Sequence, residues 1–543
     1  MGAMEGYGLT FAGKAAATAQ IRTAPQGRLV AHEGWSHQEP PHHAFVAGDN
    51  LEVLKLLRPA YAGRVDCIYI DPPYNTGRDF VYRDRWADGS DAFLLRSGQR
   101  DTDGNVLVAN PVTSGRYHSA WLSMMLPRLA VARELLADTG VVFVSIDDHE
   151  VSNLRLLLDE IFGADCFIAQ VVVVSNRGGR DYLRIATTHE YVLCYGKNAD
   201  APVAELPRAP AAAAKTDDRG TYELRELRNR NPKFTPANRP NLAYSIWVDP
   251  QTVDEANGTC AVSPAPSAGA IEVVPRAKSG SGSVWRWGQP KLAAAIVPGD
   301  PAASEVVARS VRGGGWRIFE KSRKNTTKAR SIWDDPAMRS ERGTQTLRAL
   351  MGAAVFDHPK PVDLVARCLQ LGMPADGLAL DFFAGAGTTA HAATQLNAAD
   401  NGTRRTLSIN LAEAVPADST AAAEGFDTID AIARARIARV VTAPEHLRTF
   451  SVGPEDDAAP PCPWHAALAG GTALDATPRK PAPDTWRFET GTHPHVVFTG
   501  RQLTRDVVQG WDLPPHARVS CRADALDDAT TLYLARRYTL SRT

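Results

Sequence analysis

Apolar positions along residues 43–200 follow two periods that alternate with each other. Apolar residues three and four apart predict helices, and short continuous apolar runs predict buried strands. The segments with helical spacing are 50–61, 150–163 and 121–140, which Gly140 is expected to end, and the strand segments are 65–70, 141–147 and 189–197. This alternation predicts a parallel or mostly parallel sheet with helices on its faces.

Residues 201–340 interrupt the alternation. Stretches such as "KSGSGSVWRWG" and "RGGGWR" predict loops that carry isolated aromatic residues. Beyond them, helices are expected again at 361–371, 387–397 and 427–441, and strands at 378–383 and 405–413. The chain therefore predicts an irregular arm at 1–42, two halves of one α/β domain at 43–200 and 341–450, an inserted region at 201–340 and a small domain at 455–543.

The composition is that of an ordinary globular protein, with 44% apolar and 22% charged residues in a chain of 543. The apolar runs are too short to cross a membrane and no secretory signal is present, so a cytoplasmic location without membrane contact is expected. The seven cysteines form no CxxC pair, which predicts free thiols and no metal site. The net charge is −1, yet residues 201–350 hold 23 Lys and Arg against 15 Asp and Glu, a net charge of +8 that suits phosphate groups.

A glycine-rich turn follows the strand expected at 378–383. Gly385 and Gly387 would let backbone N–H groups approach a ligand closely at the start of a helix. Together with Ala390 they match the dinucleotide pattern GxGxxA, and Glu413 ends the next strand at the spacing of a ribose-binding acid. The turn predicts a nucleotide-like cofactor, and it fits NAD, FAD and S-adenosylmethionine alike.

The segment "IYIDPPYNTG" (68–77) places a carboxylate, two prolines and an aromatic ring after a buried strand. Asp71 stands at the carboxyl end of that strand, where open α/β sheets bind their ligands. Pro72 and Pro73 make the backbone rigid, so that the Pro72 carbonyl and the Asp71 carboxylate are two acceptors held together. Two such acceptors suit an exocyclic amino group, and Tyr74 offers a flat face on which a base can stack.

Together with "DFFAGAGTTAHA" later in the chain, "DPPYNTG" resembles the amino-methyltransferases that modify adenine N6 or cytosine N4 in DNA. The order of the two motifs is that of the permuted β class. Other segments, among them "GDNLEVLKLL", "THEYVLCYGKN" and "FDHPKPVDLV", are similar to the modification (Mod) subunits of type III restriction–modification systems. The resemblance covers about residues 43–440. It implies an α/β, Rossmann-like fold of S-adenosylmethionine-dependent methyltransferases, circularly permuted, with an inserted target-recognition region and a small C-terminal domain.

The resemblance also implies roles for individual residues. Its catalytic positions are Asp71, Pro72, Pro73 and Tyr74, so the flipped target base would stack on Tyr74 and donate its amino hydrogens to Asp71 and the Pro72 carbonyl. The amino nitrogen would attack the methyl group of S-adenosylmethionine directly. The implied cofactor-binding positions are Asp49, Asp71, Lys360, Pro361, Asp381, Phe382, Phe383, Ala384, Gly385, Gly387, Thr388, Thr389 and Glu413.

The implied partners are double-stranded DNA, a separate restriction subunit if the chain serves a restriction system, and a second copy of the chain, with activity at the bacterial nucleoid. Basic residues in the inserted region are the candidates for DNA contacts, namely Arg286, Arg317, Lys321, Arg323 and Lys324. The tryptophans Trp285, Trp287 and Trp316 suit base contacts and internal packing equally well.

Three other residues with helical spacing, Trp121, Met124 and Met125, are expected in the core. Residues 147–149 (DDH) fit a metal or acid–base cluster, and they fit a strand-end turn and helix cap as well.

Several alternatives remain open at the level of sequence. The aspartate of "DPPY" favours adenine, because cytosine-N4 enzymes of this class more often carry serine there, and cytosine N4 is the alternative within the class. An NAD- or FAD-dependent oxidoreductase and a catalytically silent DNA-recognition subunit are alternatives from other classes. Bound nicotinamide or flavin would identify the first. No methyl transfer to DNA, with unchanged DNA binding by Asp71→Ala, would identify the second.

Overall fold

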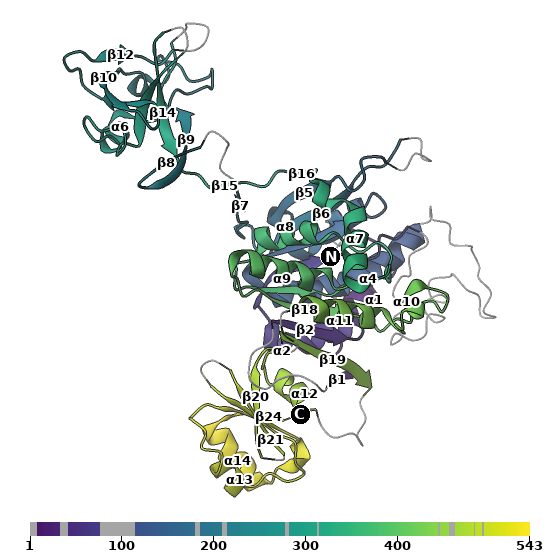
Figure 1. The fold of residues 1–543 in the computed structure, drawn as a ribbon. Coiled ribbons are helices and arrows are strands. Elements are labelled where there is room, and N and C mark those ends of the chain that lie inside the picture. Colours follow the sequence, from purple (N-terminus) through teal and green to yellow (C-terminus); the bar gives the residue numbers. More distant parts are fainter. Residues whose placement is uncertain are drawn as a thin grey trace, which may run out of the picture. The chain divides into compact units, whose positions relative to one another are not determined.

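The computed structural model describes residues 8–32, 42–76, 115–179, 185–208, 214–276, 282–311, 314–441, 443, 446–454, 462–482, 484–490 and 493–542. The chain divides into two compact units, which Figure 1 traces. The larger unit consists of Met1–Ala204 and Arg330–Thr543, and the smaller unit is Glu205–Ala329.

A ten-stranded sheet forms the centre of the larger unit. From β19 to β4 in the order below, all neighbouring strands are parallel, whereas β1 and β6 run antiparallel to their neighbours. The spatial order is β1 (Gly27–Ala31), β19 (Leu447–Pro454), β2 (His43–Ala47), β18 (Arg405–Asn410), β17 (Leu378–Asp381), β3 (Val65–Ile70), β4 (Leu136–Ile146), β6 (Glu190–Gly196), β5 (Phe167–Val173) and β16 (Ile332–Trp333). The predicted mostly parallel sheet is therefore confirmed. The predicted circular permutation rests on motif order alone and stays a prediction.

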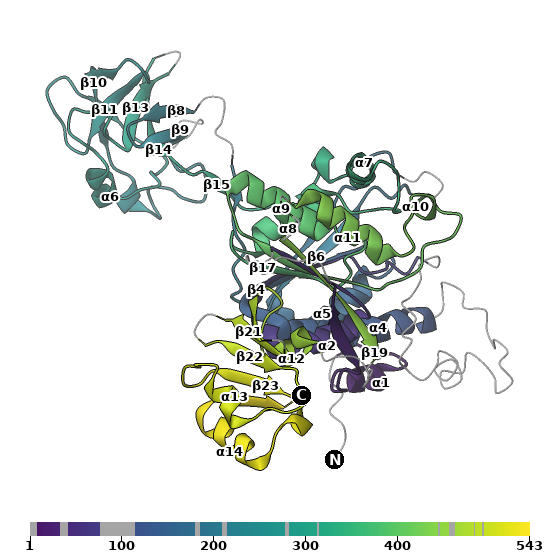
Figure 2. The same cartoon turned by 60° about the horizontal axis from the view of Figure 1, so that its bottom comes forward.

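Helices lie on both faces of this sheet (Figure 2). One layer holds α1 (Lys14–Gln20), α2 (Asn50–Tyr61), α4 (Gly115–Leu135) and α5 (Val151–Phe162), and the other holds α7 (Ser340–Met351), α8 (Val362–Gly372), α9 (Thr388–Asp400) and α11 (Ile429–Val440). The short helices α10 (Thr420–Ala423), η1 (Ala164–Cys166) and η3 (Pro336–Met338) lie in connections. The faces turned toward the sheet are apolar, and Trp121, Met124 and Met125 are buried as predicted.

The sequence prediction for the end of α4 is wrong. The helix ends at Leu135, and β4 begins at once with Leu136, so Gly140 lies inside a strand. The N–H groups of Gly63 and Arg64 donate to the carbonyls of Glu134 and Leu135, which draws the end of the helix into the sheet beside β3. Helical spacing in the sequence cannot reveal such long-range hydrogen bonds.

The N-terminal arm is also more regular than predicted. Residues 14–20 form α1, which packs against α4, and residues 27–31 form β1 at the edge of the sheet. The partner of β1 is β19, more than 400 residues later, with Ala31 opposite Phe450. Regular structure here depends on that distant strand, so local periodicity is a weak guide.

The smaller unit is built on a seven-stranded sheet with its own apolar core, in which Trp285 is buried. The order is β12 (Ile271–Val273), β10 (Ile246–Asp254), β11 (Thr259–Ser263), β13 (Val306–Ser310), β14 (Trp316–Ser322), β9 (Gly220–Glu226) and β8 (Lys215–Asp217). It also contains α6 (Gln289–Ala294), η2 (Pro240–Leu242) and a two-stranded pair, β7 (Leu206–Pro207) and β15 (Thr326–Thr327).

The C-terminal part of the larger unit carries a five-stranded sheet. Its strands are β20 (Thr477–Ala482), β21 (Thr485–Glu489), β22 (His495–Phe498), β23 (Arg518–Cys521) and β24 (Thr539–Arg542), and its helices are α12 (Pro463–Ala469), α13 (Arg505–Gln509), α14 (Asp528–Arg537) and η5 (Ala523–Ala525). The helix α12 packs against α2 and β1 through the buried Trp464, which joins this sheet to the main core.

All seven cysteines carry free thiols, as predicted. Among the helices of the described residues, none is both long enough and apolar enough to cross a membrane.

Candidate active site

The strands β3 and β17 bring the two sequence motifs to one edge of the sheet. They are parallel neighbours, with Leu380 of β17 opposite Ile68 of β3. Asp71 follows β3 and Asp381 ends β17, so both motifs begin at the carboxyl ends of adjacent strands. This edge is where open α/β sheets bind their ligands.

The glycine turn has backbone conformations that favour glycine. Gly385 has φ 50° and Gly387 has φ 76°. A Cβ atom at Gly387 would stand 3.1 Å from the carbonyl oxygen of Ala433 and 3.2 Å from Cγ1 of Ile437. Gly387 is also the N-cap of α9, and the first N–H groups of a helix have no partner within it. Within the turn, the Gly385 N–H donates to Asn410 Oδ1 and the Gly387 N–H donates to the Ala384 carbonyl. The backbone donors for a ligand are therefore those at the start of α9, where a side chain on Gly387 would collide with α11.

The Asp381 carboxylate is hydrogen-bonded to residues of the glycine turn and of α9. Its carboxylate accepts hydrogen bonds from the Phe383 N–H at 3.1 Å and from the Thr389 hydroxyl at 2.5 Å. Burial raises the pKa of Asp381 to about 7, although both hydrogen bonds lower it. Both carboxylate oxygens are thus used within the turn, and a role of Asp381 and Thr389 in binding a cofactor stays a prediction.

A buried amide links α2 to the glycine turn. Asn50 donates from Nδ2 to the Phe382 carbonyl at 2.8 Å and accepts at Oδ1 from Nε of Arg128 at 2.5 Å. Arg128 also pairs with Asp49 at 3.1 Å, and Asp49 caps α2 by accepting from the Glu52 N–H. Asp49 thus stands next to Asn50, which contacts the turn, and its role in binding a cofactor stays a prediction. Asn50 and Arg128 were missed by the sequence reasoning.

The DPPY segment (71–74) presents the two expected acceptors. The Asp71 side chain is 27% exposed, but its Oδ1 atom is buried and accepts no hydrogen bond from the described residues. Burial raises the pKa of Asp71 to about 6, and the nearby Lys360 opposes that rise. The Trp121 indole donates to the Pro73 carbonyl at 2.7 Å, which fixes the backbone. The Pro72 carbonyl accepts from none of the described residues.

Two residues that the sequence reasoning placed elsewhere or missed stand beside Tyr74. The Lys360 ammonium hydrogen-bonds the Tyr74 hydroxyl, lies 2.8 Å from Glu190 Oε2 and 3.4 Å from Asp71 Oδ1, and is 4.7 Å from the centre of the Tyr74 ring. The Tyr74 hydroxyl donates to the same Glu190 oxygen at 3.2 Å. Burial lowers the pKa of Lys360, but Asp71 and Glu190 raise it further, so the net direction is upward. The Lys360 ammonium therefore contacts Asp71 and Tyr74 of the DPPY segment, and its role in binding a cofactor stays a prediction.

A buried carboxylate holds the residue after Tyr74. Asn75 has φ 61°, a left-handed conformation. Its Nδ2 donates to Glu150 Oε1 at 2.5 Å, and the other Glu150 oxygen accepts from Asn153 at 2.8 Å. His118 Nδ1 lies 2.6 Å from Glu150 Oε1. Glu150 is fully buried, and the sequence gives no sign of its role because its partners Asn75 and His118 lie 75 and 32 positions away.

Residues 147–149 form a turn before α5. His149 bonds Asp147 at 2.9 Å, and Asp148 accepts from the Tyr191 hydroxyl at 2.9 Å. Within the described ranges no three His, Cys, Asp or Glu side chains are placed to hold a metal ion. The contacts of these residues are those of a turn.

The remaining predicted cofactor positions lie in the glycine turn, at the start of α8 and after β18. Pro361 is the N-cap of α8. Phe382, Phe383, Ala384 and Thr388 are buried, and Arg436 of α11 donates to the Thr388 hydroxyl at 2.8 Å. Glu413 follows β18, the strand next to β17, and is half-buried. A role for these residues in binding a cofactor stays a prediction.

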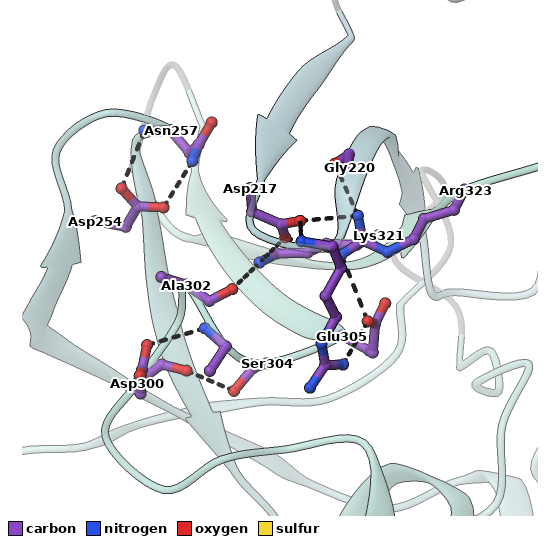
Figure 3. Close-up of polar contacts among 12 residues, drawn as sticks. Asp217, Gly220, Asp254, Asn257, Asp300, Ala302, Ser304, Glu305, Lys321 and Arg323 are labelled. Atoms are coloured by element: carbon purple, nitrogen blue, oxygen red, sulfur yellow. Dashed lines mark hydrogen bonds and ion pairs between the residues drawn. The ribbon is translucent and has the colours of Figure 1, made fainter.

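Most of the predicted DNA-contacting residues form ion pairs within the smaller unit. Figure 3 shows Lys321 and Arg323 converging on Asp217, at 3.0 Å and 2.8 Å. The Lys321 side chain is 0% exposed and also donates to the Ala302 carbonyl, so its assignment as a DNA contact is wrong in this conformation. A count of basic residues cannot distinguish a buried ion pair from an exposed cation.

The other basic candidates differ in exposure. Arg286 donates to the Glu226 carbonyl and pairs with Glu320 at 2.9 Å. Lys324 pairs with Glu205 but is 55% exposed, and Arg317 is exposed on β14. Contacts of these residues with DNA stay predictions. Trp285 is core, with its indole donating to the Tyr244 carbonyl.

A glycine turn and a DPPY segment lie at adjacent strand ends, and comparison with known proteins gives the class of protein. A family model described as DNA methylase matches residues 65–409. The chain belongs to this DNA methylase family.

Named relatives are similar in sequence to most of the chain. The chain is 32% identical over 451 residues to the Mod subunit of the type III restriction-modification enzyme EcoPI of Escherichia phage P1, covering 80% of this chain and 68% of that protein. It is 33% identical over 445 residues to the StyLTI Mod subunit of Salmonella typhimurium, covering 80% and 63%. It is 31% identical over 404 residues to the type II methyltransferase M.KpnI of Klebsiella pneumoniae, covering 72% and 85%.

Solved structures resemble the chain only weakly. One is a DNA modification methylase of Thermus thermophilus complexed with S-adenosyl-L-methionine, with 14% identity, a TM-score of 0.32, and 76% of this chain and 97% of that chain covered. Another is the PvuII DNA methyltransferase, cytosine-N4-specific, with 11% identity, a TM-score of 0.31, and 75% and 96% covered. Scores this low add nothing to the fold assignment.

Proposed function

We propose that the protein transfers a methyl group from S-adenosylmethionine to the N6 amino group of adenine in double-stranded DNA. The observation that carries the proposal is the Asp71 carboxylate beside the Pro72 carbonyl at the strand end next to the glycine turn. The buried Asp71 Oδ1 accepts no hydrogen bond from the described residues, and the Lys360 ammonium lies 3.4 Å from it as an ion pair. A buried acceptor without a hydrogen bond is costly unless a ligand supplies its donor.

The residues present fit S-adenosylmethionine. The start of α9 would hold it through backbone N–H groups, the turn at Gly385 and Gly387 would let it approach closely, and Asp49 and Glu413 would accept from its adenosine. The cofactor, when bound, supplies an electrophilic methyl group on a sulfonium. Asp381, Thr389 and Asn50 would keep the turn in shape beneath it.

The DPPY segment would hold the target. Asp71 and the Pro72 carbonyl each accept one amino hydrogen, which turns the nitrogen lone pair toward the methyl group. As the nitrogen gains the methyl group, it must lose one proton, and Asp71 is the base within reach. The ring of Tyr74 would stack on a base that has left the duplex. Positioning and fixed dipoles would carry the acceleration, without a covalent enzyme intermediate.

Adenine is favoured over cytosine N4 by the aspartate at position 71. The smaller unit, Glu205–Ala329, is our candidate for target recognition. Since two of the named relatives are Mod subunits, we further propose that a separate restriction subunit acts with this chain in the bacterial cytoplasm, at the nucleoid. We also propose that the chain forms a homodimer. Membership in the DNA methylase family leaves the oxidoreductase alternative without support.

Modified-base sequencing of a host that expresses this one protein tests the proposal. The expected result is methylated adenine at one recurring sequence, absent from a host that expresses Asp71→Ala at the same level. Methylated cytosine would support the N4 alternative. No modification by either protein, with equal DNA binding, would support the catalytically silent subunit.

A further inference from the structure

The ammonium of Lys360 is enclosed by acceptors of the DPPY segment and by Glu190. Its contacts are Glu190 Oε2 at 2.8 Å, the Tyr74 hydroxyl, and Asp71 Oδ1 at 3.4 Å. An ammonium has three N–H bonds. Two of them are used by Glu190 and Tyr74, and Asp71 lies at ion-pair distance. The side chains of Lys360 and Glu190 are only 12% and 11% exposed. This is a built site for a donor nitrogen.

The same nitrogen stands where the amino group of a target base is needed. It lies over the Tyr74 ring, 4.7 Å from the ring centre, which is within the range of stacked ring centres. An amino group that donates to Asp71 must come within about 3 Å of a carboxylate oxygen. A base stacked on Tyr74 would therefore compete with Lys360 for both the ring and the carboxylate.

Glu190 can keep the ammonium while the base takes its place. Glu190 is the first residue of β6, and β6 is hydrogen-bonded to β4 on one side and β5 on the other. The backbone of Glu190 is therefore held in place by the sheet. Lys360 has a flexible four-carbon stem that can turn about a fixed partner. The ammonium can leave Asp71 and Tyr74 without losing Glu190.

We propose that Lys360 is a placeholder for the target base, and that Glu190 is the anchor that retains its ammonium when the base displaces it from Asp71 and Tyr74. The inference rests on the proposed function, because it requires an amino-bearing base on Tyr74. It also gives a reason for selecting that base. An amino group supplies donors in place of the cation that Asp71 loses, whereas a base with a carbonyl at that position would leave a buried carboxylate unpaired.

Binding of two DNA duplexes distinguishes the placeholder role of Lys360 from direct binding of the base and from a general role in DNA binding. Both duplexes carry the recognition site mapped by sequencing, one with the intact target base and one with an abasic position in its place. Affinities are measured by fluorescence anisotropy, with a non-reactive cofactor analogue, for the wild type, Lys360→Met, Glu190→Gln and the double variant. Lys14→Met is the control, because Lys14 pairs with Glu160 and contacts no residue of the site. Methylation of the intact duplex by the wild type, measured alongside, reports separately on the proposed function.

Lys360→Met and Glu190→Gln should change the affinity for the intact duplex, relative to the abasic duplex, in opposite directions. Lys360→Met should bind the intact duplex roughly three- to tenfold more tightly relative to the abasic duplex, since no ion pair must be displaced. Glu190→Gln should lower the affinity for the intact duplex relative to the abasic duplex, and the double variant should have the same relative affinity as Lys360→Met. A lower ratio for Lys360→Met would show that Lys360 binds the base, and an equal effect on both duplexes would show a general role. Either result overturns the proposal. Unfolding midpoints verify folding, and Lys360→Gln replaces Lys360→Met if the latter does not fold.

Discussion

Replacing Gly387 with alanine probes the cofactor turn at its tightest point. The left-handed backbone at φ 76° costs an alanine about 1–2 kcal/mol, and reduced entropy of the unfolded chain returns about 0.4–1 kcal/mol of this. The new Cβ would stand 3.1 Å from the Ala433 carbonyl oxygen and 3.2 Å from Ile437 Cγ1, and such overpacking costs about 1–3 kcal/mol. The expected loss of stability is about 1–5 kcal/mol.

Gly63→Ala is the matched control for backbone strain. Gly63 has φ 67°, and no atom lies within 4 Å of a Cβ added there. It lies just before the start of β3, whereas the DPPY segment follows the end of β3. The difference between the two variants therefore isolates the contact between the turn and α11.

Calorimetric titration with S-adenosylmethionine and urea unfolding measure the two effects. Gly387→Ala should weaken cofactor binding at least about tenfold, because the start of α9 must shift by tenths of an ångström to admit the Cβ. Gly63→Ala should bind the cofactor within about twofold of the wild type. Equal losses of stability and unchanged binding in both variants would refute the idea that the turn has no room for a side chain.

The remaining contacts lead to four further predictions. Since burial raises the pKa of Asp71 to about 6, the rate of methyl transfer should fall as pH drops through 6, and a constant rate from about pH 5 to 8 would contradict the acceptor role. Asn50→Ala should lower the free energy of urea unfolding by about 1–3 kcal/mol, because two buried partners lose their hydrogen bonds; no change would contradict this. Glu150→Ala should lower kcat more than about tenfold while the cofactor Kd stays the same, and an unaltered kcat would exclude a positioning role. Arg317→Ala should reduce the salt dependence of DNA binding by about one ion, whereas Lys321→Met should destabilise the smaller unit and leave that dependence alone; the opposite pattern would restore Lys321 as a DNA contact.

The residues at strand ends could be predicted because they combine a local pattern with a general rule. An apolar strand followed by Asp71, or by the glycine turn, places chemistry at the carboxyl edge of a parallel sheet. The structure puts β3 and β17 side by side at that edge. Neither prediction required knowledge of distant contacts.

Glu190 could not be found in this way. It stands at the start of its strand, and in a wholly parallel sheet the start lies at the edge away from the site. Because β6 is antiparallel to β4, with Tyr191 opposite Ile146, its start reaches the carboxyl edge of β4. Strand direction depends on long-range pairing, and the apolar pattern of 189–197 carries no sign of it.

Lys360 and Lys321 show the same limit for charged side chains. Sequence grouped Lys360 with the cofactor turn that follows it and Lys321 with a run of basic residues. In the structure each ammonium is drawn to carboxylates from other strands, Glu190 in the first case and Asp217 in the second. Partners of this kind are set by the fold and lie 170 and 104 positions away.

Mass spectrometry of nucleosides tests the central claim most directly. Purified protein is incubated with unmethylated DNA and S-adenosylmethionine that carries a deuterated methyl group, and the DNA is digested to nucleosides. The expected product is deuterated N6-methyldeoxyadenosine, absent when Asp71→Ala replaces the wild type. Deuterium in N4-methyldeoxycytidine would contradict the assigned base, and label in no nucleoside would contradict the assigned activity.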